Sequence, residues 1–373
     1  MQSVYLDTAI ATVFVVLLFS ILTYSIQEWL AAVRQLRGKM LEKAIFEAFN
    51  DSLNKSFGVL IYEHPNIDLL KRNQDSLPAY MPSANFATAL IDLISRESTT
   101  VSYVVNAETK LLEERVAGFS NIPYDNFKAG VETLKHSDLK VLLQSFLLST
   151  NTYTDLQNTI EIWFNQYMDR VSGWYRKKTS YTVGVIAALL VLVFNFDAIF
   201  LVKRIYNDSN LRGTLVADAT NAVNHPDEIN AVLGKSVEKQ ISVNDAVWQA
   251  KIKLADSTHQ GNPDTLRALN AAWLAERNKI ADSARVATQK QIKSEIETIN
   301  GLNLPIGWKV DDKGIDFAST FRTKGRPVWS ILVGWVLAGI LISFGAPFWF
   351  NLLIKLVPLR KAGVKPAAES SKK

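Results

Sequence analysis

Three stretches of the chain are almost purely apolar, and the segments between them have ordinary mixed sequence. They lie near residues 8–26, 181–202 and 328–354. The first holds 19 residues without a charge, and at about 1.5 Å per residue a helix of that length nearly crosses a hydrocarbon core about 30 Å thick. The leader Met1–Asp7 contains no Lys or Arg, and no small-residue cleavage site follows. The pattern therefore predicts an uncleaved transmembrane helix rather than a signal peptide.

The other two apolar stretches are interrupted. Residues 181–202 include Asp197 near their end, and the stretch that begins at residue 328 is broken by Gly345 and Pro347. Proline lacks a backbone donor and disfavours helix at the residue before it, so a helix break is expected at this point. The short amphipathic piece that follows fits an interfacial helix end better than a fourth span.

Between the apolar stretches, hydrophobic residues recur at three- and four-residue spacing, which is typical of helices. In residues 26–49 this stripe predicts one long helix that leaves the membrane and packs into a bundle; a helix lying on the lipid surface is the alternative. Thr265–Ile299 carries a second long helical pattern, and no region predicts a strand. The predicted fold class is all-α, an integral membrane protein with three transmembrane helices and two helical extramembrane regions.

The expected organisation has six parts, with an orientation set by Lys and Arg near the spans. No basic residue precedes the first helix and four follow it closely, which places the N-terminus outside. The parts are an N-terminal transmembrane helix (1–26), a cytosolic helical bundle (27–180), a second transmembrane helix (181–202), a helical extramembrane region on the outer side (203–327), a third transmembrane helix with the Gly/Pro break and an interfacial end (328–357), and a basic, partly disordered inner tail (358–373).

Composition narrows the function classes. The net charge of +5 is better explained by topology and anionic lipid than by nucleic acid. The chain has no cysteine and four scattered histidines, so disulfides and thiolate chemistry are excluded and neither a metal nor a cofactor is expected. It also lacks a phosphate-binding loop, a dinucleotide fingerprint, a zinc-protease motif and a nucleophile elbow. We therefore assign no catalytic residue and expect no enzyme.

Two sets of residues inside the apolar stretches are candidates for function. A charge such as Asp197 is costly within an apolar helix unless it is paired or hydrated. Asn195 and Asp197 therefore form a polar or water-lined site between helices, or else lie where the helix reaches the headgroups. Gly334, Ala338 and Gly339 place small residues at close spacing and predict a helix-packing face.

Two further sets lie at the ends of spans. Gly345 and Pro347 mark the predicted helix break. Arg176, Lys177 and Lys178 immediately precede the second span, where juxtamembrane basic residues contact anionic lipid, an interpretation we favour over nucleic-acid binding.

Several segments together resemble a family of bacterial integral membrane proteins of uncharacterised function. The resemblance rests on SIQEWLAAVRQLRGKMLEKAI, YMPSANFATALIDLI, the SGWYRK run before the second span, LVFNFDAIFLVKRIYND, LPIGW and GAPFWFNLLIKLVPLRKAG. Asn351 and Asn165 depart from it, because an acidic residue is expected at each. The resemblance implies a bacterial inner-membrane protein with its N-terminus outside. It supplies no activity, ligand or partner.

These observations lead to one functional hypothesis and one alternative. The hypothesis is a non-enzymatic inner-membrane effector, with a homo-oligomer as a candidate assembly. Its cytosolic helical region holds a protein partner, and its membrane helices respond by altered packing or permeability. By analogy with other small multi-span effectors, such a protein would suit abortive infection in phage defence. The alternative is a structural scaffold that tethers partners at the envelope.

Overall fold

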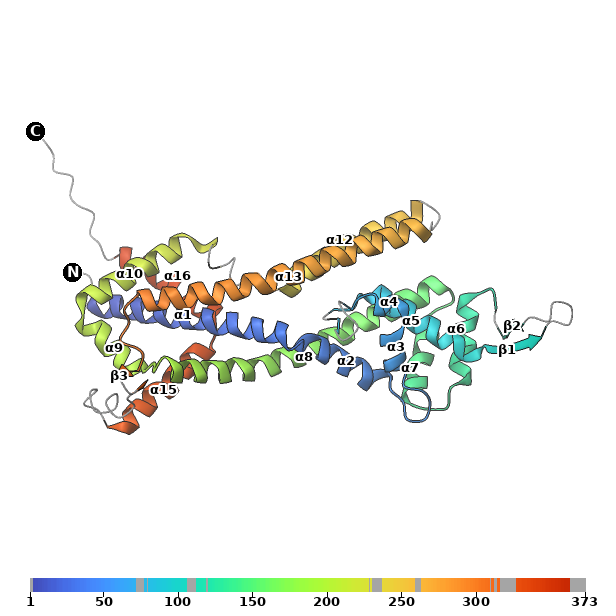
Figure 1. The fold of residues 1–373 in the computed structure, drawn as a ribbon, viewed down its shortest axis with the longest axis horizontal. Coiled ribbons are helices and arrows are strands. Elements are labelled where there is room, and N and C mark those ends of the chain that lie inside the picture. The colour runs from blue at the N-terminus through green and yellow to red at the C-terminus, as the bar shows by residue number, and fades with distance from the viewer. Residues whose placement is uncertain are drawn as a thin grey trace, which may run out of the picture. The chain divides into compact units, whose positions relative to one another are not determined.

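A computed structural model describes residues 3–71, 77, 78, 80–105, 112–118, 120–227, 229, 237–258, 263–308, 310, 311, 314, 315 and 327–362. The regular structure of these residues is helical apart from two short strand pairs (Figure 1). The helices are α1 (Val4–Val33), α2 (Leu36–Phe49), α3 (Phe57–Glu63), α4 (Pro65–Asp68), α5 (Ser83–Ser95), η1 (Arg96–Ser98), α6 (Pro123–Thr133), α7 (Asp138–Leu147), α8 (Tyr153–Val193), α9 (Ala198–Asn207), α10 (Ser209–Asn224), α12 (Val237–Thr258), α13 (Pro263–Gly301), α15 (Val328–Ser343) and α16 (Ala346–Ala362). The expected tail lies outside the described residues beyond residue 362.

The strand pairs correct the expectation that no region forms a strand. β1 (Thr100–Val105) and β2 (Leu112–Ala117) pair antiparallel, with Thr100 opposite Ala117, and β3 (Val310–Asp311) pairs with β4 (Gly314–Ile315). β1 reads TVSYVV, and its β-branched and aromatic residues favour an extended chain. The signal is only six residues long, too short for a period to stand out beside the helical stripes. The helical fold class is confirmed with these two ribbons added.

One helix of the described chain is long and apolar enough to cross a membrane. It is α1, which covers the predicted first span. The other two apolar stretches each form a bent helix pair: α8 with α9, at 56°, and α15 with α16, at 90°. Each pair could be a broken span or a re-entrant loop, so the number of spans is one, or up to three if each pair crosses.

The first helix ends earlier than the sequence suggests. Instead of one helix through residues 26–49, α1 stops at Val33 and Gln35 takes a left-handed conformation with φ of 51° before α2 begins. The Gln35 Oε1 accepts a hydrogen bond from the Leu77 N–H at 3.0 Å. A β-carbon on Gly38 would stand 2.8 Å from the Leu77 Cβ. A packed loop distant in sequence, rather than a local breaker, therefore sets this end.

The chain forms two compact units. Unit 1 comprises residues 1–32, 177–240 and 280–373, and unit 2 comprises residues 33–176 and 241–279. Helices α8 and α13 each contribute to both units. The structure thus divides the chain differently from the expected regions 27–180 and 203–327, because residues 241–279 belong with the first of them.

Unit 2 is a helical bundle around an aromatic core. Phe49 on α2 packs edge-to-face on Phe86 of α5 and on Trp163 of α8, while Phe86 stacks on Phe164 with ring centroids 4.2 Å apart. Trp273 of α13 is 2% exposed and joins this same core. Burial of several large rings together is the main stabilising term of such a bundle.

Unit 1 packs around α1. The apolar window of this helix is 72% buried by the rest of the protein. Its neighbours in the core come from α8, α9, α10, α15 and α16, with Ile299 from α13. Phe19 of α1 stacks on Phe196, at the junction of α8 and α9, with centroids 4.6 Å apart. The one described helix that is long and apolar enough to cross a membrane is therefore the centre of unit 1 rather than part of its surface.

Candidate functional site

The junction between α8 and α9 is a built polar site inside unit 1. Asn195 has φ of 46°, a left-handed conformation that asparagine tolerates better than most residues. The break leaves carbonyls at the end of α8 without helical donors. The Trp308 Nε1–H donates to the Leu192 carbonyl at 2.8 Å, and the Gly307 N–H donates to the Phe194 carbonyl at 2.6 Å. The 302–308 loop thus satisfies the end of the helix.

Asn195 itself connects three segments. Its Nδ2 donates to the Gly307 carbonyl at 3.0 Å, and its Oδ1 accepts from the Trp335 Nε1–H of α15 at 3.2 Å. The residue is 1% exposed. A buried amide is costly unless both of its ends are hydrogen-bonded, and here both are.

Asp197 begins α9. Its Oδ1 accepts the Phe200 N–H at 3.0 Å, which makes it the N-cap of that helix, and the residue is 2% exposed. A carboxylate at a helix N-terminus is favoured by the helix dipole. Arg204, near the end of the same helix, pairs with Asp208 at 3.4 Å. The structure brings Asn195 and Asp197 together as a capped, buried break.

The predicted small-residue face on α15 exists for two of its three members. Gly334 lies directly against the Asp197 carboxylate, so that any β-carbon there would overlap it. Ala338 is fully buried on the same side. Gly339 is not part of this face, because a β-carbon there would meet nothing within 4 Å. A helical turn of 3.6 residues places positions 334 and 338 together and turns 339 aside.

α15 ends at Ser343 and α16 begins at Ala346, so the helix is interrupted at Gly345. Gly345 has φ of +85°, which glycine alone adopts freely, and α16 starts at the next residue with Pro347 in its first turn. The Trp349 Nε1–H donates to the Leu341 carbonyl at 2.7 Å and so satisfies the end of α15.

The basic residues Arg176, Lys177 and Lys178 lie in the middle of continuous helix α8 rather than in a loop, and all three are exposed. Trp174 and Tyr181, one turn to either side, are 48% and 73% exposed. Exposed aromatic and basic residues in one short segment are typical of the membrane–water interface.

An ion pair in unit 1 has no counterpart in the sequence analysis. Arg360 Nε at the end of α16 lies 2.8 Å from Asp7 Oδ1 at the start of α1, and the side chains are 28% and 11% exposed. Since 353 positions separate the two residues, no local pattern could have paired them.

A second missed pair lies in unit 2. Asp245 of α12 accepts the Trp273 Nε1–H at 2.7 Å, and Arg277 Nε stands 3.4 Å from the other carboxylate oxygen. Arg277 also donates to the carbonyls of Leu70 at 3.3 Å and Tyr80 at 3.1 Å. Burial raises the pKa of the Asp245 carboxyl and lowers the pKa of Arg277. This cluster docks α12 and α13 on the bundle.

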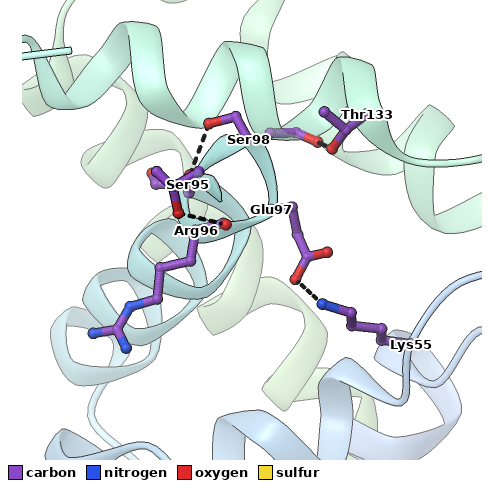
Figure 2. Close-up of polar contacts among 8 residues, drawn as sticks. Lys55, Ser95, Arg96, Glu97, Ser98 and Thr133 are labelled. Atoms are coloured by element: carbon purple, nitrogen blue, oxygen red, sulfur yellow. Dashed lines mark hydrogen bonds and ion pairs between the residues drawn. The ribbon is translucent and has the colours of Figure 1, made fainter. Parts of the chain in front are cut away.

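The loop that leads from α5 to the β1–β2 ribbon is held by ordinary polar contacts (Figure 2). Lys55 Nζ lies 2.7 Å from Glu97 Oε1, and the Ser98 hydroxyl donates to the Ser95 carbonyl at 2.9 Å. Arg96 pairs with Asp92 of α5 at 2.7 Å. These contacts close the turn that connects α5 to β1.

The exterior of unit 1 differs sharply between helices. On α8, α9 and α15, large apolar side chains are exposed; they include Val185, Leu189, Val202, Leu332, Val336 and Ile340. On the last turns of α13 the exposed side chains are polar; they include Gln289, Lys290, Lys293, Ser294, Glu297 and Thr298. α10 likewise exposes Thr214, Asn221 and Asn224. Figure 1 shows α10 and this part of α13 on one side of α1, with α8 and α15 on the other.

Helix α13 reaches α1 through a partly buried polar contact. The Ser25 hydroxyl donates to Glu295 Oε1 at 2.9 Å, and Gln291 Nε2 donates to the same oxygen at 2.8 Å. The polar helix α13 therefore packs directly on the apolar helix α1. Glu295 faces α1, whereas Lys293 and Glu297 are exposed.

Within the described part of the chain, no three His, Asp or Glu side chains are grouped so as to hold a metal ion. Comparisons with protein-family models, curated proteins and solved structures found no match to this chain. The geometry of the two units is therefore the basis for a functional proposal.

Proposed function

We propose that this protein is an integral membrane effector of the bacterial inner membrane, in which a protein partner bound to unit 2 alters the packing of unit 1 and the permeability of the bilayer. The first support is the covalent route between the units. Helices α8 and α13 are 41 and 39 residues long, and each contributes to both cores. A partner that shifts either helix in one core applies the displacement to the other.

The observation that carries the proposal is the two-sided exterior of unit 1. Acyl chains accept the exposed apolar side chains of α8 and α15 but not the exposed Lys293 and Glu297 of α13, since charges facing lipid are costly. In a membrane these polar helices need water or one another. We therefore propose a homo-oligomer whose α10 and α13 faces turn inward toward a polar, hydrated interior.

The packing of unit 2 also supports a revised topology. A bilayer cannot separate segments that share one core, and Trp273 is buried in the core formed by residues 33–176. We propose that residues 33–176 and 241–279 are both cytoplasmic, instead of residues 203–327 lying outside. In this topology α1, the α8–α9 pair, α10 and α13 pass through the membrane in turn, and the α15–α16 pair, bent by 90°, is a re-entrant loop on the outer side. The Asp7–Arg360 ion pair supports this arrangement, because it keeps the end of α16 beside the start of α1.

Single-cysteine labelling tests the two-sided exterior, because the natural chain has no cysteine. We expect Glu297→Cys on α13 to react with a membrane-impermeant maleimide in intact membranes, while the matched Val336→Cys on α15 reacts only after solubilisation in denaturant. If both cysteines are equally protected from the maleimide in intact membranes, the proposed hydrated interior is wrong.

Membrane potential separates the effector from the alternative, a scaffold that tethers partners through unit 2. A potential-sensitive dye should report depolarisation when the protein is overexpressed, and a scaffold should leave the potential intact. Asp197→Asn is the sharpest variant, because asparagine keeps the helix cap while removing the buried charge. We expect this variant to accumulate normally and to depolarise less. Unchanged depolarisation and toxicity would argue against a role of this charge in permeability.

Phage defence by abortive infection remains the proposed physiological setting. Its support is architectural, a cytoplasmic partner-binding unit joined to a membrane unit. Plating efficiency of a phage panel on cells with and without the gene tests it, with Asp197→Asn as the matched strain. If every phage plates equally on cells with and without the gene, the proposed role in phage defence is wrong, whereas the proposed membrane activity is unaffected.

A further inference from the structure

An apolar groove runs along the outside of unit 1. It has a volume of about 790 Å³ and is walled by α1, α9 and α15. Representative wall residues are Thr8, Thr12, Ile199, Val202, Leu337 and Leu341. The Thr8 and Thr12 hydroxyls donate to carbonyls of their own helix, at 2.7 Å each. Because the hydroxyls are satisfied within α1, the threonine methyl groups and the aliphatic side chains give the groove apolar walls.

One end of the groove is polar. Tyr5 of α1 and Tyr206 of α9 lie there with ring centroids 5.7 Å apart, 75% and 42% exposed. Lys203, one turn before Tyr206, is exposed and is the one charged side chain among the described residues that line the groove.

The neighbouring cations have other partners. Arg204 pairs with Asp208 at 3.4 Å, and Arg212 donates to the carbonyls of Ile205 and Tyr206 at 3.1 and 2.7 Å. Lys203 is thus the ammonium group available at this mouth.

We propose that the groove binds an anionic phospholipid, with an acyl chain between α1, α9 and α15 and the phosphate beside Lys203 and the two tyrosine hydroxyls. An apolar slot with one cation and a hydrogen-bonded pair of tyrosine hydroxyls at one end matches an amphiphile that has an apolar chain and an anionic head. A zwitterionic lipid would leave the ammonium without a net opposite charge. This inference rests on the proposed membrane location of unit 1.

The same site can regulate the effector. Its walls include Ala198, one residue after Asp197, and Leu337, one turn after Gly334. A bound chain would therefore hold α9 and α15 against α1 beside the α8–α9 break. Loss of the lipid would loosen the packing of α15 on α9, where Gly334 contacts the Asp197 carboxylate.

Native mass spectrometry of the full-length protein tests the proposal. The protein is incorporated into nanodiscs containing equal amounts of phosphatidylglycerol and phosphatidylethanolamine, released in mild detergent, and the retained lipids are identified. We expect wild type to retain phosphatidylglycerol preferentially and Lys203→Ala to lose this preference about fivefold. Lys355→Ala removes an exposed lysine of α16 away from the groove, and it should behave as wild type.

A groove-filling variant tests the acyl chain separately from the headgroup. Ala9 lines the groove and is exposed, so Ala9→Phe should reduce retention of both lipids. Equal effects of Lys203→Ala and Lys355→Ala, or retention without headgroup preference, would overturn the proposal. So would a lipid-free dimer disrupted by Ala9→Phe, since a second copy would then fill the groove.

Flotation with lipid vesicles, measured on the same preparations, separates this proposal from the one it rests on. Protein that fails to float contradicts the membrane location and the groove together. Protein that floats but retains no phosphatidylglycerol contradicts the groove alone.

Discussion

Units 1 and 2 are both built from helices, but they differ in which side chains they bury and which they expose. Unit 2 buries its aromatic rings, such as Phe49 and Phe86, in a conventional core. Unit 1 also has an apolar core, yet it leaves side chains such as Leu332 and Val336 49% and 62% exposed. It also buries Asn195 and Asp197 at a helix break. Under the proposed membrane location, lipid would contact the apolar exterior of α8 and α15, and water or another copy would contact the polar exterior of α10 and α13.

Each unit also holds a buried or half-buried ion pair between segments distant in sequence. In unit 2, Asp245 and Arg277 are 1% and 5% exposed and bind neutral donors and acceptors as well as each other. In unit 1, Asp7 and Arg360 close the two ends of the chain on one another at 2.8 Å. The comparison teaches that the first pair docks α12 and α13 on the bundle, whereas the second joins the start of α1 to the end of α16.

The largest expected effect falls on the docking cluster of unit 2. Arg277→Met removes two hydrogen bonds to carbonyls and leaves Asp245 as an uncompensated buried charge. We expect a loss of about 3–5 kcal/mol in unfolding free energy, read as a lower thermal midpoint and early proteolysis in residues 241–279. The matched Lys279→Met alters an exposed lysine two residues further along α13. It should change the unfolding free energy by less than about 0.5 kcal/mol. Equal stability of the two variants would mean that α13 does not dock through Arg277.

A smaller effect is expected from adding one methyl group to α15. Gly334→Ala forces a β-carbon into the Asp197 carboxylate, and overpacking of this kind costs roughly 1–3 kcal/mol. Gly339→Ala meets open space, and it should be neutral or stabilise the helix by about 0.5–1 kcal/mol. Thermal unfolding in detergent measures both. If the two variants are equally destabilised, α15 does not pack on α9 as described.

The smallest effect concerns the clamp in unit 1. A double-mutant cycle of Asp7→Asn and Arg360→Gln should give a coupling energy of about 1 kcal/mol, because the pair is partly exposed. The charge swap Asp7→Arg with Arg360→Asp should recover part of the stability that either single reversal loses. If the single effects are additive and the charge swap recovers no stability, the ends of α1 and α16 are not paired in solution.

The sequence alone determined the helical character, the apolar stretches and the break at Gly345. These properties are local: the 3.6-residue period, an uncharged run long enough to span and the positive φ of one glycine before a proline are all written in neighbouring residues. The polar pair Asn195 and Asp197 was also visible, because a charge in an apolar run stands out. The sequence did not show that their role is to cap a break.

Only the tertiary structure decided which distant segments share a core. It ended α1 near Gln35 through contacts with Leu77, selected Gly334 over Gly339 and paired Asp7 with Arg360. It also moved residues 241–279 into the core of residues 33–176 through Trp273. The physical reason is common to all four. Hydrophobic burial is non-directional, so many partners satisfy an apolar face, and close packing with hydrogen bonding of buried polar groups selects one of them.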